Sequence, residues 1–138
     1  MREVITRCIL CNICRIEDGK GNILVQERTK KDWPGLNFPG GHVENKEPLD
    51  DSVRREIKEE TGLSLGKVTF CGIREWPWRD DIRYFTFVYK SKDFQGELKN
   101  SEEGKVFWIK KEDLFHYQCS QDLDKIFAIC ESRCYQDE

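Results

Sequence analysis

Several short stretches of the chain are rich in β-branched and aromatic residues and alternate with polar positions, which is the pattern of β-strands. We predict strands over residues 4–16, 23–27, 67–76, 82–90 and 106–109, with a further short strand after the Phe38-Pro39-Gly40-Gly41 segment. The Gly- and Asp-containing turn at residues 17–22 predicts that the first two strands form a hairpin. The strands at 67–76 and 82–90 are expected to form a second antiparallel pair.

Two segments carry helical periodicity instead. Leu49, Val53 and Ile57 recur at i, i+4 and i+8 within a helix expected from about residue 48 to 61. Pro48 suits the first turn of this helix and Gly62 suits the position just past its end. Ser120 is the expected cap of a last helix, whose apolar side consists of Leu123, Ile126, Phe127, Cys130 and Cys134. The order of elements predicts a mixed sheet flanked by helices, in the α/β (α+β) class.

Three acidic residues of the first helix stand three and four positions apart: Glu56, Glu59 and Glu60. Neighbouring like charges on a helix repel one another. On a helical wheel Glu56 and Glu60 fall within about 20° of Leu49, beside the inward stripe, where binary patterning places no acids. A hard divalent cation with oxygen ligands would offset the repulsion, whereas the alternative is a solvated acidic helix face.

Length and composition limit the classes of function. A chain of 138 residues is long enough for one domain with its own core, and 12% aromatic residues argue against disorder even though 36% are charged. A net charge of −3 gives no basic footprint for duplex nucleic acid. No apolar run approaches membrane-spanning length and the first residues do not resemble a signal peptide, so we expect a cytoplasmic protein without a membrane partner.

The seven cysteines form no convincing zinc site. Cys8, Cys11 and Cys14 are evenly spaced, but on a strand the alternation of side chains places Cys11 on the face opposite to the other two. A second C-x-x-C pair that would complete four ligands is absent from the sequence. An odd number of cysteines without a secretory signal favours reduced, buried or half-buried thiols.

The acidic helix belongs to a longer motif with fixed spacing. The chain resembles the Nudix hydrolases, because it matches the fixed positions of their signature, the Nudix box, at Gly41, Glu47, Arg55, Glu56, Ile57, Glu59, Glu60, Gly62 and Leu63. The resemblance implies an α/β/α sandwich, a single Nudix hydrolase domain over residues 1–138 and cleavage of a diphosphate linked to another group. It also implies a divalent cofactor, Mg²⁺, with Mn²⁺ as the alternative.

The resemblance assigns roles within the box. Glu56, Glu59 and Glu60 would bind metal together with Gly41, and one of the three glutamates would act as the general base, which the sequence does not identify. Arg55 offers a planar fork that would orient these ligands by pairing with Glu59 or with Glu47. Substrate binding is implied at Gly40 and Gly41, where glycine lets the backbone pass close to a phosphate.

Outside the box the chain is similar to the MutT-like oxidised-purine nucleoside triphosphatases, through Asn12-Ile13-Cys14, residues 38–45 and Trp76-Pro77. This resemblance implies a small-molecule nucleotide substrate, 8-oxo-dGTP or a related triphosphate, cleaved to the monophosphate and pyrophosphate. Two alternatives stay open. One is a Nudix hydrolase acting on ADP-ribose, a dinucleoside polyphosphate or an RNA 5′ end, and the other is a non-catalytic nucleotide-binding module. The oligomeric state is open as well.

Four further site residues come from the resemblance, each beside a simpler interpretation. Asn37 would bind the purine or serve as a turn residue, and Asp122 would read the base or favour a helix start. Glu103 would bind metal or act as a base, unless it is a solvated loop residue, and Arg28 would face the phosphates or the solvent. Trp33, Trp76 and Trp78 could stack a base or pack in the core. His42 is interpreted as local structure, because no Ser or Cys partner is placed for a triad.

Overall fold

The computed structural model describes residues 2–28 and 34–132, apart from the side chains of residues 77 and 78. The strands are β1 (Arg7–Ile16), β2 (Asn22–Arg28), β3 (Leu36–Asn37), β4 (Gly40–His42), β5 (Ser64–Leu65), β6 (Thr69–Arg79), β7 (Ile82–Ser91), β8 (Phe94–Gln95) and β9 (Gly104–Lys110). The helices are α1 (Leu49–Thr61), the 3₁₀ helix η1 (Lys111–His116) and α2 (Leu123–Glu131). None of the described helices is long and apolar enough to cross a membrane.

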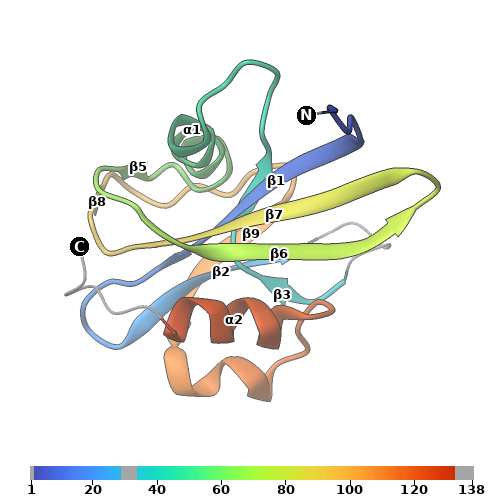
Figure 1. Cartoon of the computed structure of the whole chain (residues 1–138). Helices are drawn as coiled ribbons and strands as arrows, with labels where there is room; N and C mark the ends of the chain where they lie inside the picture. The colour runs from blue at the N-terminus through green and yellow to red at the C-terminus, as the bar shows by residue number, and fades with distance from the viewer. Residues whose placement is uncertain (1, 29–33, 133–138) are drawn as a thin grey trace.

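The strands form a middle layer between two helices (Figure 1). A mixed sheet has the order β4-β1-β7-β6, in which β1 and β7 run parallel and the other neighbours antiparallel. An antiparallel sheet has the order β3-β2-β9, and β5 pairs with β8. Helix α1 lies on one side of the strands and α2 on the other. The predicted mixed sheet between helices is therefore confirmed, as are the β6–β7 pair and the strand at β9.

Alternation along the strands divides the core into two clusters. Ile13 of β1 belongs to the cluster that includes Leu123 and Ile126 of α2, whereas the next residue, Cys14, belongs to the cluster that includes Val53 and Ile57 of α1. Both sheets contribute to both clusters. Because each strand has one face toward each helix, the face of every strand residue can be assigned from its position.

The predicted hairpin between the first two strands is wrong. Strands β1 and β2 lie in different sheets and are joined only by an isolated bridge between Glu17 and Ile23. The turn itself forms as expected, since Asp18 accepts hydrogen bonds from the backbone of Lys20 and Asn22. The pairing differs because β4 and β7 occupy both edges of β1, which leaves β2 to pair with β3 and β9. The first strand also begins at Arg7 rather than at residue 4.

Helix α1 has the predicted bounds. Pro48 stands at its N-cap, and Gly62 ends it in the left-handed conformation at φ 84°, donating its N–H to the carbonyl of Lys58. A side chain at position 62 would be strained by that backbone conformation and would also meet the carbonyl oxygen of Glu97 at 2.6 Å. Proline and glycine in the sequence therefore predicted both ends of this helix correctly.

The predicted cap of α2 is wrong. The N-cap is Asp122, and the hydroxyl of Ser120 instead donates to the carbonyl of Leu36 on β3 at 3.0 Å. Leu123, Ile126 and Cys130 are buried as expected, while Cys134 lies outside the described residues. The contact with β3 is made by tertiary packing that the sequence pattern does not reveal.

None of the six described cysteines is in a disulfide. Cys14 and Cys130 are buried in the two core clusters, Cys8 is exposed, and Cys11, Cys71 and Cys119 are partly exposed.

A buried arginine anchors the end of α2. The side chain of Arg15 is only 2% exposed, and its guanidinium lies 3.3 Å from Glu131 and 3.5 Å from Glu17. It also stands over the ring of Phe127, at 5.2 Å from the ring centre. We predict that Arg15→Met lowers the free energy of unfolding by about 2 kcal/mol in urea denaturation, because charge-assisted contacts with α2 are lost.

Arg7→Met is the matched control, since Arg7 and its partner Asp81 are both more than two-thirds exposed. Exposed pairs contribute little, so this variant should stay within about 0.5 kcal/mol of the parent protein. Equal losses in the two variants would contradict an anchoring role for Arg15.

Candidate functional site

The three carboxylates of helix α1 differ in how far they are buried. Glu60 is 7% exposed and Glu56 is also largely covered, whereas the side chain of Glu59 is 59% exposed. The inward placement of Glu56 and Glu60 follows the helical wheel, because both lie beside the stripe that contains Val53 and Ile57. Burying two carboxylates next to each other costs free energy unless other groups compensate.

The backbone of β4 lies directly against these carboxylates. The N–H of Gly40 donates to Glu60 Oε2 at 3.2 Å. A Cβ atom at position 40 would overlap the backbone of Asn12 and Ile13, so glycine is needed there, and a Cβ atom at position 41 would displace the carboxylate of Glu56. The Gly40-Gly41 pair therefore brings backbone N–H and carbonyl groups beside two acids of α1.

Two polar residues that the sequence reasoning missed complete this contact. Gln26 of β2 donates to Glu60 Oε2 at 3.4 Å. Asn12 of β1 accepts from the N–H of Gly41 at 3.2 Å and donates to the hydroxyl of Ser52 at 2.9 Å. Both side chains are 3% exposed. Polar residues within otherwise apolar buried strands break the binary pattern, and that break was the available signal.

Arg55 organises the opposite side of the acidic cluster. Its guanidinium pairs in bidentate fashion with Glu47, at 2.7 and 3.0 Å, and donates to the carbonyl of His42 at 2.9 Å. Its Nη1 donates to Glu56 at 3.0 Å and to Glu59 at 3.3 Å. Sequence reasoning anticipated either Glu47 or Glu59 as its partner, and the structure has both. His42 serves here through its backbone, which agrees with its interpretation as local structure.

Burial raises the pKa values of two of these carboxylates, Glu60 and Glu56. Burial raises the pKa of Glu60 to about 7, with the charges of Glu56 and Glu103 adding to the effect and the Gly40 N–H opposing it. Burial also raises the pKa of Glu56, although Arg55 works against this. The hydrogen bond with Glu47 raises the pKa of Arg55 itself, so the guanidinium stays charged. The cluster therefore holds more negative charge than its protein partners balance.

This donor set fits a hard divalent cation. Carboxylate and carbonyl oxygens are the ligands that Mg²⁺ and Mn²⁺ prefer, and Glu56, Glu59, Glu60 and the Gly41 carbonyl could supply them. Within residues 2–28 and 34–132, no three His, Cys, Asp or Glu side chains are already gathered as a cation would need. The reason is visible in the hydrogen bonds, since Glu56 and Glu59 point to Arg55 and would have to turn to bind a metal.

Glu103 lies close to this cluster, because its charge acts on Glu60. It precedes Gly104, which stands opposite Arg28 in the β2–β9 pairing. Arg28 and Gln26 are two residues apart on β2, so their side chains share the face that points to α1. The Nε atom of Arg28 is buried and has no hydrogen-bond partner among the described residues. The roles of Glu103 and Arg28 in metal and phosphate binding stay predictions.

Asn37 of β3 stands opposite Gln26 and therefore lies on the same face of its sheet. Its Oδ1 accepts from the backbone N–H of Phe38 at 2.9 Å. This bond fixes the orientation of the amide, because a backbone N–H needs an acceptor, and it leaves the side-chain NH₂ as a donor. Asn37 is half-buried, three residues before Gly40 in the chain.

Asp122 lies at the start of α2 near β3. The backbone N–H of Ser120 and its hydroxyl both donate to the carbonyl of Leu36. Asn37 directly follows Leu36 on β3, and Asp122 follows Ser120 by two residues. The carboxylate of Asp122 accepts from Arg74 of β6 at 3.3 Å. Asp122 is thus separated from the acidic cluster of α1 and is close to the residues that follow β3.

The three tryptophans considered for base stacking differ in what can be said of them. Trp76 donates its indole N–H to Thr86 at 2.7 Å and packs against the core cluster on the α2 side. Trp33 and the side chain of Trp78 lie outside the described part of the chain. Core packing, the simpler interpretation, is therefore the observed role of Trp76.

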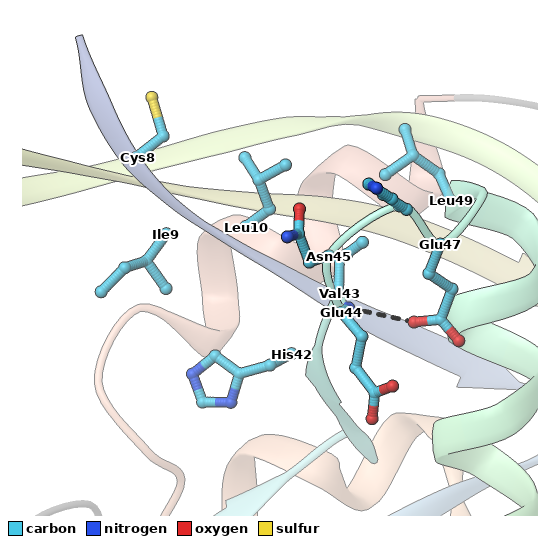
Figure 2. A pocket seen from close by; sticks show the side chains of 10 residues that line it. Cys8, Ile9, Leu10, His42, Val43, Glu44, Asn45, Glu47 and Leu49 are labelled. Carbon is cyan, nitrogen blue, oxygen red and sulfur yellow. Dashed lines mark hydrogen bonds between the residues drawn. The ribbon is translucent and has the colours of Figure 1, made fainter.

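A hollow of about 420 Å³ opens beside the loop that leads into α1 (Figure 2). It is lined by the first half of β1 and by residues of this loop, among them Leu10, Glu44 and Glu47. The backbone N–H of Glu44 donates to Glu47 there. Because neither Glu56 nor Glu60 lines it, the hollow is distinct from the acidic cluster.

Comparison with known proteins identifies relatives of this chain. The model of the NUDIX domain matches residues 10–128. Proteins named nucleoside triphosphatase NudI, from Escherichia coli O139:H28 and Shigella flexneri, are 34% identical over 119 residues that cover 76% of each chain. An identity of 34% over this length is well above the identity found between proteins that share only a fold.

Solved structures agree on the fold. A MutT NUDIX hydrolase from Burkholderia pseudomallei superposes with a TM-score of 0.78 at 22% identity, covering 88% of this chain and 97% of the other. The E. coli ORF135 protein superposes with a TM-score of 0.76 at 24% identity, covering 94% of this chain and 96% of the other. At these identities the likeness concerns the arrangement of strands and helices.

The raised pKa of Glu60 makes a prediction about stability. A carboxyl whose pKa is higher in the folded state than in the unfolded state costs stability as pH rises from about 4.5 to 7. In the absence of metal at pH 8, we therefore expect Glu60→Gln to be more stable than the parent protein by on the order of 2 kcal/mol. Thermal unfolding across this pH range measures the effect.

Glu59→Gln is the matched control, since its carboxylate is mostly exposed and no such gain is expected. Adding Mg²⁺ should raise the melting temperature of the parent protein but not that of Glu60→Gln. A destabilised Glu60→Gln variant at pH 8 would show that the charge of Glu60 is already compensated.

Proposed function

The chain belongs to the Nudix family of hydrolases, and from this premise we propose that it cleaves nucleoside triphosphates to the monophosphate and pyrophosphate. The observation that carries the proposal is the acidic cluster of α1, closed on one side by Gly40-Gly41 and on the other by Arg55. Relatives named as nucleoside triphosphatases, at 34% identity, support the substrate class.

The proposed cofactor is Mg²⁺, with Glu56, Glu59, Glu60 and the Gly41 carbonyl as its ligands and Glu103 beside them. When bound, the ion would polarise phosphoryl oxygens and lower the pKa of a bound water. Arg55 holds Glu56 and Glu59 within reach of one another, which reduces the cost of gathering like charges. The Nε–H of Arg28, buried without a partner in the described chain, is a donor suited to a phosphate oxygen.

For the base, we propose an oxidised purine such as 8-oxo-dGTP, which would make the protein part of nucleotide-pool sanitation in the cytoplasm. Two residues support this substrate. The amide of Asn37 has its NH₂ left as a donor for a base carbonyl, since its oxygen is bonded to Phe38. The carboxylate of Asp122 is an acceptor for a base N–H.

A substrate panel tests the proposed function. The purified protein with Mg²⁺ should release pyrophosphate from nucleoside triphosphates, with 8-oxo-dGTP preferred, and chelation of the metal should stop the reaction. ADP-ribose and a dinucleoside polyphosphate belong in the same panel. Release of orthophosphate alone, or turnover of ADP-ribose without turnover of any triphosphate, would contradict the proposal.

Arg55→Lys tests the geometry of the acidic cluster. A lysine keeps the charge but cannot pair with Glu47 in bidentate fashion while donating to Glu56 and Glu59. We predict that kcat falls by at least about tenfold while the far-UV circular dichroism spectrum stays unchanged. Arg54→Lys is the matched control, because Arg54 lies one residue away and contacts the carbonyl of Gly66 instead. Parent-like kinetics for Arg55→Lys would reduce Arg55 to a structural cation.

Asn37→Asp tests base recognition with little change in size. The carboxylate retains an acceptor but lacks the NH₂ donor, so a base carbonyl loses its partner. We expect KM for 8-oxo-dGTP to rise by about tenfold or more, with little change in the dependence of turnover on Mg²⁺ concentration. Unchanged KM would remove Asn37 from the base site, and a weakened response to Mg²⁺ would place it at the metal instead.

A further inference from the structure

Arg74 lies at the centre of a small polar group on the α2 side of β6. Its side chain is 25% exposed, and its Nη2 donates to Asp122 Oδ2 at 3.3 Å. The guanidinium also stands over the indole of Trp76, 5.4 Å from the ring centre. Arg74 has no place in the Nudix box and carries no signal in the sequence.

Neighbouring residues on β6 and β7 fix the position of Arg74. Trp76 is held by its hydrogen bond to Thr86 on β7, and Arg74 stands opposite Thr86 in the β6–β7 pairing. A guanidinium over an indole face gains an attractive contact in addition to its ion pair. The Nε atom of Arg74 is buried and has no hydrogen-bond partner among the described residues, whereas its Nη2 is bonded to Asp122.

Asp122 is unusual for an N-cap residue. Its backbone is in the left-handed region at φ 66°, and its side chain makes no capping hydrogen bond. The carboxylate instead lies between two cations, Arg74 at 3.3 Å and Lys125 at 3.5 Å. The two cations hold the carboxylate between β6 and α2. Each carboxylate oxygen has a further lone pair, so the group can still accept a hydrogen bond from a ligand.

We propose that Arg74 is a positioning residue for base recognition, which holds the Asp122 carboxylate, an acceptor, in one orientation and so favours bases that present an N–H donor. The inference rests on the proposed function. A 6-oxopurine, such as guanine or its 8-oxo form, has N–H donors at N1 and at the 2-amino group. The N1 atom of adenine is an acceptor, which faces an ionised carboxylate unfavourably.

The role differs from that of a simple structural ion pair. A structural pair would affect folding alone, whereas a positioning residue changes which base is preferred, and it does so through Asp122. The effect of Arg74 on base preference must therefore vanish once the side chain at position 122 is no longer an acceptor alone. Asp122→Asn meets this condition, because an amide offers both a donor and an acceptor.

A double-mutant cycle tests the proposal. Arg74→Met keeps the length of the side chain and its packing on Trp76 but removes the charge. We expect it to raise KM for dGTP and 8-oxo-dGTP by about tenfold, to leave kcat within about twofold, and to lower the kcat/KM preference for dGTP over dATP by about tenfold. Arg74→Lys should recover part of this loss. In the Asp122→Asn background, Arg74→Met should change the preference less than about twofold.

Arg83→Met is the control, because Arg83 likewise pairs with an acid, Glu75, and stands over an aromatic ring, Phe85, and it should keep the preference of the parent protein. Melting temperatures verify folding, and Arg74→Gln replaces Arg74→Met if the latter does not fold. An unchanged preference in Arg74→Met, or an equal loss in both backgrounds, would overturn the role of Arg74 while leaving the proposed function intact. A parent protein that hydrolyses no triphosphate would overturn both.

Discussion

The guanidinium of Arg55 is the point at which the loop before α1 and the helix itself are joined. It binds the Glu47 carboxylate and the His42 carbonyl on the loop side and the Glu56 and Glu59 carboxylates on the helix side. Without such a cation, acids one turn apart on α1 would repel one another. Arg55 does not reach Glu60, whose negative charge is partly covered by Gly40 and Gln26 and remains in excess. This remaining charge is what makes the cluster suited to a cation.

The fold serves this cluster by bringing distant strands to one helix. Strand β4 pairs with β1 and lies against Glu56 and Glu60, while β2 supplies Gln26 from the other sheet. The second helix lies on the opposite side of the strands (Figure 1) and is connected to β3 through Leu36 and Ser120. Asp122, which is proposed to read the base, thus lies at the start of α2, whereas the carboxylates proposed to bind the metal lie on α1.

Much of the site was predictable because it is local in sequence. The bounds of α1 follow from Pro48, its apolar stripe and Gly62, and the inward turn of Glu56 and Glu60 follows from helical geometry. The partners of β1 were not predictable, since an apolar strand with a good turn after it fits a hairpin as well as two separate sheets. The cap at Ser120 failed for a similar reason, because its hydroxyl is used by a contact with β3.

The residues that sequence reasoning missed act through long-range contacts. Gln26 and Asn12 were detectable in principle, since each is a polar residue within a buried strand. Arg74 was not, because a charged residue on an edge strand is ordinary until its partners across the sheet and on α2 are known. Motif spacing identifies groups on one element, whereas hydrogen bonds between elements need the fold.

We propose that the carboxylates of Glu56 and Glu60, whose negative charge is in excess, form a cation site that faces the Gly40-Gly41 backbone. A crystal structure of the protein with Mn²⁺, read by anomalous scattering, tests it most directly. We expect an anomalous peak for an Mn²⁺ ion bound by carboxylates of α1 and by the carbonyl of Gly41, with Glu56 or Glu59 turned away from Arg55. Mn²⁺ bound elsewhere, with Arg55 still holding both carboxylates, would contradict it.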